Sequence, residues 1–215
     1  MWISIRMLLN IQRSVGKKQT RYNAEIVAGA LIPSESRIIA QLVLDGISKE
    51  QLKHLLTIEN ILQKRSPATA VRAAELIKKR FAFVNDELLR IIAKGNRQAL
   101  MQALLVAAIK HNRLIGDFLL RVVKEKWRLF ETKLKPADWE NFLRECEQLD
   151  ETVLQWKLTT RAKLGQVVKK CLVEAGFLES ATNPTITPVL ILPEIKTYLL
   201  ENNEDYVLEC MSIFI

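Results

Sequence analysis

The chain has 215 residues, of which 49% are hydrophobic and 26% are charged. This composition is typical of a soluble globular protein that is long enough for one large domain or two small ones. With 7 glycines and 6 prolines, the chain is poorly suited to long loops and to an extended β architecture, while abundant Leu, Ala, Ile, Lys and Glu favour helix.

The formal net charge of +8 is unevenly distributed. Residues 1–82 carry +8 and residues 83–135 carry +6, whereas residues 136–215 carry −6. A basic body followed by an acidic tail predicts a polyanionic partner for the body and leaves open a basic partner for the tail. The alternative is that the charge only keeps the protein soluble.

Cysteine usage and hydropathy indicate the cellular compartment. Cys146, Cys171 and Cys210 show no paired spacing, and Cys171 falls on an apolar helical face, which favours a buried thiol in a reducing compartment. Arg6 interrupts the apolar N-terminus, so no signal peptide is expected. The most apolar run, Ala103 to Ile109, is far shorter than the roughly 20 residues that span a bilayer. We therefore expect a soluble, cytoplasmic protein with no membrane partner.

Helix signals organise most of the chain. Residues 1–21 lack strong periodicity and are interpreted as an N-terminal extension, and the folded part is expected to begin near Tyr22. Capping residues and glycine stops then predict helices from Pro33 to Gly46, after a capping box at Ser48, from Ser66, over Asp86–Lys94, after Asn96 and over about Leu114 to Phe130. A linker candidate at Lys133–Pro136 divides a helical domain, 22–135, from a C-terminal domain, 136–215.

The helix from Ser66 has the clearest beginning. Ser66 can cap the free amides of the first turn, and Pro67 suits the first helical position. One face of this helix is apolar at helical spacing: Ala70, Ala74, Ile77 and Phe81. A short helix, a tight basic turn and a second capped helix are typical of a helix-turn-helix unit. An ordinary pair of packed helices with a solvated basic side remains an open interpretation.

The C-terminal domain follows a different pattern. Pro136 begins a helix, a short helix follows around Thr152–Trp156, and Thr159 or Thr160 can cap a third helix that ends at Gly176. Two short strands are expected next, over Phe177–Glu179 and Ile186–Leu190, and then a helix from near Pro193 and an apolar tail that docks on the body. This order predicts a winged-helix-like unit with a short β-hairpin, so the fold class is mainly α with two helix-turn-helix-like units.

Candidate nucleic-acid contacts lie in both units. Between Thr152 and Val173 there are five basic residues and no acidic one, although the surrounding third of the chain is acidic. The expected phosphate contacts are Lys64, Arg65, Arg72 and Lys79 in the first unit and Arg161, Lys163, Lys169 and Lys170 in the second. Thr69, Thr160 and Gln166 are expected to reach groove edges. A winged domain used only in protein contacts is the alternative.

Signatures of enzymatic chemistry are absent from the sequence. There is no G-x-G-x-x-G, Walker loop, H-E-x-x-H or G-x-S-x-G motif. His54 and His111 have no Cys or second His at ligand spacing, and both are expected at the surface. We therefore expect no active site, no metal and no cofactor.

Four segments of the N-terminal half carry a family resemblance: Tyr22–Glu25, Ala28–Leu31, Glu35–Ala40 and, most specifically, Asn60–Ala70. They resemble the BrxA family of bacteriophage-exclusion (BREX) defence systems. The resemblance implies a non-enzymatic, all-helical, DNA-binding accessory protein of a system that methylates host DNA. The family is also similar in fold to an RNA-binding antitermination factor, which keeps RNA open as a ligand.

Two expectations of function therefore compete. In the first, the protein binds duplex DNA mainly through phosphate contacts. In the second, it is an adaptor that assembles other BREX proteins, such as a methyltransferase or an ATPase, and its basic charge is incidental. RNA binding is a third and weaker possibility.

Overall fold

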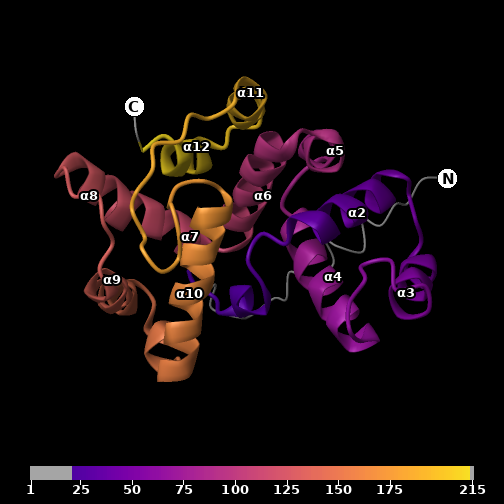
Figure 1. Ribbon diagram of the computed structural model, residues 1–215, viewed down its shortest axis with the longest axis horizontal. Helices are drawn as coiled ribbons and strands as arrows, with labels where there is room; N and C mark the ends of the chain where they lie inside the picture. The colour runs from indigo at the N-terminus through magenta and orange to yellow at the C-terminus, as the bar shows by residue number, and fades with distance from the viewer. Residues whose placement is uncertain (1–20, 214–215) are drawn as a thin grey trace.

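The structure is a computed structural model that describes residues 21–213. The expected extension, residues 1–21, therefore lies outside the described residues except for Arg21. In the described part the chain is mainly helical, which confirms the mainly α part of the predicted class (Figure 1). No helix within these residues has both the length and the hydrophobicity needed to cross a bilayer.

The N-terminal part consists of short helices, and residues next to their starts cap two of them as predicted. They are η1 (Glu25–Ala28), α2 (Pro33–Leu44), α3 (Lys49–Thr57), α4 (Pro67–Phe81) and α5 (Asp86–Lys94). The predicted capping box is present, because Ser48 Oγ accepts from the Gln51 amide at 3.1 Å and Gln51 Oε1 accepts from the Ser48 amide at 2.9 Å. Ser66 caps α4 as predicted.

The central helices form the frame. α6 (Arg97–His111) is buried on most of its circumference, as its apolar sequence predicted, and it crosses the middle of the molecule in Figure 1. The single helix expected over 114–130 is divided into α7 (Arg113–Phe118), a π-helical turn η2 (Leu119–Val123) and α8 (Lys124–Arg128). The π-turn was not predicted, since hydrophobic periodicity does not distinguish it from continuous α-helix.

The C-terminal part contains α9 (Pro136–Leu149), the 3-10 helix η3 (Glu151–Gln155), α10 (Leu158–Glu174), α11 (Pro193–Glu201) and α12 (Asp205–Met211). The predicted start of α10 was wrong: the helix begins at Leu158, after Lys157, which gives no side-chain cap, rather than after Thr159 or Thr160. Gly176 ends the helix region at φ +87°, as predicted. The apolar tail docks on the body through buried side chains of α12.

The expected hairpin is reduced to isolated bridges. Leu178 pairs with Ile186, and Thr185 pairs with Lys133, a partner that the sequence did not indicate. The bridges cannot extend into longer strands because Pro184 and Pro188 flank the segment 185–187. Proline has no amide hydrogen to donate to a neighbouring strand.

A continuous hydrophobic core joins the two halves of the described chain. Buried side chains on either side of residue 135 belong to one cluster, from Ile26 near the start to Met211 near the end. The division into two domains at this position stays a prediction. Cys171 is fully buried in the core, as predicted, and burial raises the pKa of its thiol to about 12, so the thiol is unreactive at neutral pH.

Gly165 permits the close packing of α10 on α9. A Cβ at this position would lie 2.8 Å from Trp139 Nε1, and that indole nitrogen is fixed by donating to the Arg161 carbonyl at 3.0 Å. Gly→Ala in a helix interior usually stabilises, but here we expect Gly165→Ala to lower the free energy of unfolding by about 1–3 kcal/mol through overpacking. Thermal unfolding beside the exposed control Gln166→Ala tests this. A raised melting temperature for Gly165→Ala would contradict it.

Candidate nucleic-acid interface

The cations along α4 and in the turn before it differ in whether they are already paired. Arg65 and Arg72 are exposed, and within residues 21–213 neither has an ion-pair or hydrogen-bond partner for its side chain. Lys64 instead pairs with Glu35 of α2, and Lys79 Nζ lies 2.5 Å from Glu25 Oε1. The two arginines are therefore the cations of this helix that can meet a phosphate without breaking an ion pair.

The outer face of α10 is polar and basic. Lys163, Gln166 and Lys170 are exposed and share one face at helical spacing. Lys163 has no side-chain partner among the described residues, and Lys169 beside this face is half-buried. Lys170 Nζ is 3.9 Å from the Glu174 carboxylate, a loose i,i+4 pair that water and salt screen.

Arg161 faces the protein instead of solvent. Its guanidinium lies 2.5 Å from Glu147 of α9 and donates to the carbonyls of Val153 and Trp156 at 3.1 and 3.2 Å. Its side chain is 16% exposed. These contacts hold η3 between α9 and α10, so Arg161 fixes the start of the α10 surface. Thr160 beside it is half-buried, and Thr69 of α4 is exposed with its hydroxyl 2.9 Å from Ser66 Oγ.

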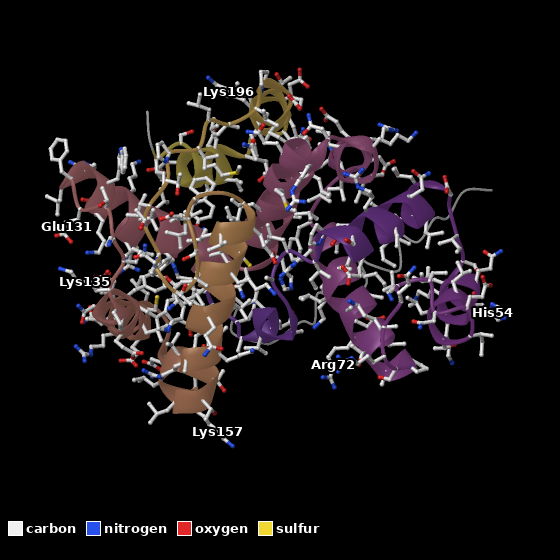
Figure 2. All side chains as sticks on the ribbon, viewed as in Figure 1. His54, Arg72, Glu131, Lys135, Lys157 and Lys196 are labelled. Atoms are coloured by element: carbon white, nitrogen blue, oxygen red, sulfur yellow. The ribbon has the colours of Figure 1, made fainter. Side chains whose placement is uncertain are left out.

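The ends of α4 and α10 lie on a common edge of the molecule. η1 packs between the two helices and contacts both (Figure 1). Figure 2 places Arg72 of α4 and Lys157, directly before α10, on this edge, whereas Lys196 of α11 lies on the opposite one. Residues from two distant parts of the sequence therefore form one basic edge.

A buried arginine joins α4 to the segment 29–31, which α10 also contacts. Arg80 of α4 is 2% exposed and donates to the carbonyls of Ala30 and Gly29, the latter at 3.0 Å. Glu174 of α10 accepts from the Leu31 amide at 2.8 Å. Burial lowers the pKa of Arg80 from its ordinary value, and the negative charge of nearby Glu174 opposes that shift. This joint attaches the C-terminal parts of α4 and α10 to the same segment, 29–31.

His111 was wrongly expected at the surface. Its side chain is 4% exposed, and Nε2 lies 3.0 Å from Glu25 Oε2, so Glu25 contacts both His111 and Lys79. Burial lowers the pKa of His111, and the hydrogen bond to Glu25 partly opposes that shift. His54 is exposed, as predicted.

Two residues at the start of α10, Lys157 and Leu158, were not among the predicted site residues. Lys157 is exposed on the basic edge, and the side chain of Leu158 is 82% exposed. They were omitted because the helix was expected to begin two residues later. The signal that could have identified them is Lys157 itself, which directly precedes the first helical turn.

The fold and this edge define a class: small, mainly helical proteins with the basic starts of two helices on one edge. Residues 20–203 match the BrxA family, and the chain belongs to that family. It is 39% identical to BREX protein BrxA of Paramagnetospirillum magneticum (strain ATCC 700264 / AMB-1), over 92% of this chain and 99% of the relative. The identity is 30% to BREX protein BrxA of Escherichia coli O9:H4 (strain HS), over 86% of this chain and 87% of that protein.

A solved structure has the same fold. The crystal structure of an uncharacterized protein from Magnetospirillum magneticum matches with a TM-score of 0.82 at 37% identity, covering 90% of this chain and 99% of the other. The resemblance found in the sequence is thus confirmed: the chain is related along almost its whole length to BrxA proteins of BREX phage-defence systems.

Proposed function

We propose that this protein is a non-enzymatic accessory component of a BREX phage-defence system that binds duplex DNA mainly through phosphate contacts. The observation that carries the proposal is the shared edge of α4 and α10, with Arg65, Arg72 and Lys163 unpaired within the described chain. Cations that give up no internal partner are the ones that gain most from phosphate and release counterions on binding.

The order of segments around α10 supports a winged-helix unit. Segment 132–134 precedes α9 and α10, and segments 177–179 and 185–187 follow them. The Ile186 amide donates to the Thr132 carbonyl at 2.7 Å, and the Thr187 amide donates to the Phe177 carbonyl at 3.0 Å, so 185–187 lies between the other two segments. In this arrangement α10 is the reading helix and the loop 180–185 is the wing.

The α3–α4 pair supports a looser helix-turn-helix unit. Its connection runs from residue 58 to 66, which is longer than the roughly 3–4 residues of the usual turn. Leu62 in this connection is 5% exposed and anchors it to the core. We infer that α4 presents Arg65 and Arg72 to phosphate, while Thr69 approaches a groove edge.

The remaining candidates take different roles in this proposal. Lys64, Lys79 and Lys170 exchange a carboxylate partner for phosphate, so each contributes less than an unpaired cation. Arg161 positions α10 through its internal contacts. Thr160 and Gln166 are placed toward the groove, and Lys163 and Lys169 contact the backbone.

Charge reversal on α10 tests the proposal. We expect the double variant Lys163→Glu, Lys169→Glu to bind a 20-bp duplex more weakly and to reduce the slope of log K against log salt by about 1.8, since each neutralised phosphate contributes about 0.9. Fluorescence anisotropy at several salt concentrations measures both quantities. Lys196→Glu, on the opposite edge, is the matched control. It should leave the salt slope unchanged and should change the affinity for the duplex only slightly.

Two results would redirect the proposal. If the double variant keeps the affinity and the slope of the parent protein, α10 is not the contact surface. If structured RNA displaces the duplex at matched salt, RNA is the preferred ligand.

We propose that the protein acts in the cytoplasm beside the methyltransferase and ATPase of its system. Co-purification with these proteins, without any mobility shift of DNA, would favour the adaptor role instead.

A further inference from the structure

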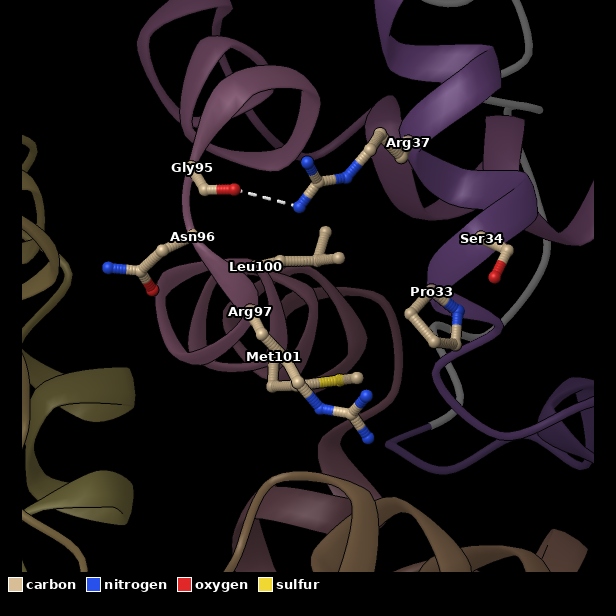
Figure 3. Close-up of a pocket in the computed structure, with 8 residues that line it drawn as sticks. All are labelled: Pro33, Ser34, Arg37, Gly95, Asn96, Arg97, Leu100 and Met101. Atoms are coloured by element: carbon tan, nitrogen blue, oxygen red, sulfur yellow. Dashed lines mark hydrogen bonds between the residues drawn. The ribbon is translucent and has the colours of Figure 1, made fainter.

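A groove crosses the face of the molecule where α2, α6 and α10 approach one another. It consists of two adjoining hollows that share Arg97 and Met101 as lining residues. The first, of about 520 Å³, lies between the start of α2 and the start of α6 (Figure 3). The second, of about 540 Å³, continues past Gln98 to the end of α10 and the segment 188–190. Hollows of this size accept side chains or small ligands.

The first hollow is positively charged and has an apolar floor. Figure 3 shows the guanidinium groups of Arg37 and Arg97 in this hollow, with Leu100 and Met101 between them. No carboxylate lines it. Arg37 is held in place by donating to the Gly95 carbonyl at 2.7 Å, and Arg97 is exposed with no side-chain partner in the described chain. Planar guanidinium groups bind carboxylates in a bidentate manner, so the hollow is complementary to a carboxylate side chain.

The wall of the second hollow is an extended segment with free hydrogen-bonding groups. Gln102 is buried and fixes this segment, because its amide nitrogen donates to the Leu190 carbonyl at 2.9 Å and its oxygen accepts from the Leu192 amide at 2.9 Å. The backbone amides of Val189, Leu190 and Ile191 donate no hydrogen bond to any residue of the described chain. Leu190 is 77% exposed. The second hollow has both polar and apolar lining residues, among them Glu174, Met101 and Val189. An unpaired extended edge beside such a hollow can accept a peptide by strand addition.

We propose that this groove binds an extended acidic segment of another protein of the same BREX system. The peptide pairs its backbone with the 188–191 edge, places a carboxylate against Arg97 in the first hollow, and places an apolar side chain two positions away in the second hollow. The two-residue spacing follows from strand geometry, in which alternate side chains point to the same face. The proposal is independent of DNA binding, since it uses neither Arg72 nor Lys163.

Peptide binding to the full chain tests this proposal. An array of overlapping 12-residue peptides that covers the other proteins of the system is probed with the labelled protein, and the strongest peptide is measured by calorimetry. We expect binders with an acidic residue two positions from an apolar one. Arg97→Glu should weaken the best peptide at least tenfold, and replacing the acidic residue of the peptide by lysine should restore binding to that variant.

Matched controls separate binding from folding and from DNA contact. Glutamate is tolerated at the first turn of α6, because a negative charge is favourable at a helix N-terminus, so Arg97→Glu should remain folded. Arg90→Glu on α5, an exposed arginine outside the groove, and Lys163→Glu on α10 should bind the peptide as the parent protein does. The proposal is overturned if no peptide binds, if the binders lack an acidic residue, if duplex DNA competes with the peptide for the groove, or if Arg97→Glu and Arg90→Glu have equal effects.

Discussion

Replacing Arg80 by methionine is expected to lower the free energy of unfolding by about 3 kcal/mol, because it leaves buried carbonyls without a donor. The guanidinium donates to the carbonyls of Gly29 and Ala30 inside the core, and it interacts electrostatically with Glu174. Methionine fills similar volume, so the loss reports the polar contacts and not a cavity. Urea denaturation measures it.

A surface ion pair on the same helix provides the control for Arg80→Met. Lys78 Nζ lies 2.6 Å from Glu75 at the exposed side of α4, where such pairs contribute about 0–1 kcal/mol. Lys78→Met should therefore change stability far less than Arg80→Met. Equal effects of the two substitutions would show that the joint between α4 and α10 is not held by Arg80.

The joint also matters for the proposed function. Arg80 contacts none of the residues that are proposed to bind phosphate. It does fix the segment 29–31, and the end of α10 is attached to this segment by the hydrogen bond between Leu31 and Glu174. In conditions where Arg80→Met remains folded, we expect weaker duplex binding with less change in salt slope than the charge-reversal variant of α10 shows. That difference would separate misplacement of the two helix ends from loss of a phosphate contact.

The features that the sequence predicted well are those determined by residues within one helical turn of one another. Ser66 and Asn96 were correctly predicted to cap α4 and α6, because each accepts from an amide three residues away. Gly176 was correctly predicted to end the α10 region, because a helix end of this kind also depends on one local residue. The mainly helical class and the buried face of α4 followed from spacing alone.

Long-range polar contacts could not be predicted in this way. Arg80, Asp117 and His111 are buried, although charged and titratable side chains are expected at the surface. Each is stabilised inside by partners far along the chain, such as Tyr22 for Asp117 at a separation of 95 residues. Nothing in the local pattern of either residue indicates that they meet.

The same reason limits the prediction of the candidate site. The sequence identifies cations but not which of them are free. Lys64 meets Glu35 across 29 residues, Lys79 meets Glu25 across 54, and Arg161 meets Glu147 within the C-terminal half. Only the fold distinguishes these paired cations from Arg72 and Lys163, which have no partner in the described chain. The paired and unpaired cations are therefore given different roles in the proposed interface.

Asp117→Asn is expected to weaken the attachment of residues 21–22 and of α12 to α7, and to change the response to acid. The Asp117 carboxylate is almost fully buried and accepts from Tyr206 at 2.6 Å, from Tyr22 at 2.7 Å and from Arg21 at 3.0 Å. It therefore joins α7 to the first described residues and to α12. Losing hydrogen bonds to a buried charged acceptor is expected to lower stability at neutral pH by about 2–4 kcal/mol.

The pH dependence gives this prediction its distinguishing measurement. Burial alone would raise the pKa of Asp117, but hydrogen bonds from Tyr206, Tyr22 and Arg21 outweigh burial and hold the pKa below its ordinary value of 3.8. A carboxyl group with a lowered pKa in the folded state stabilises the fold above its unfolded pKa, and this contribution is lost as the pH falls through the folded pKa. The parent protein should thus lose stability below a pH of about 4, and Asp117→Asn should lose less over the same range.

Urea denaturation from neutral pH to the acid limit compares the two proteins. Their stabilities should converge on acidification, since protonation removes from the parent protein the charge that the substitution has already removed. Glu140→Gln on the exposed side of α9 is the control, and its curve should follow the parent protein because a surface carboxylate without a partner contributes little to stability. Parallel curves for Asp117→Asn and the parent protein would mean that the charge of Asp117 does not hold residues 21–22 and α12 on α7, and that neutral hydrogen bonds suffice.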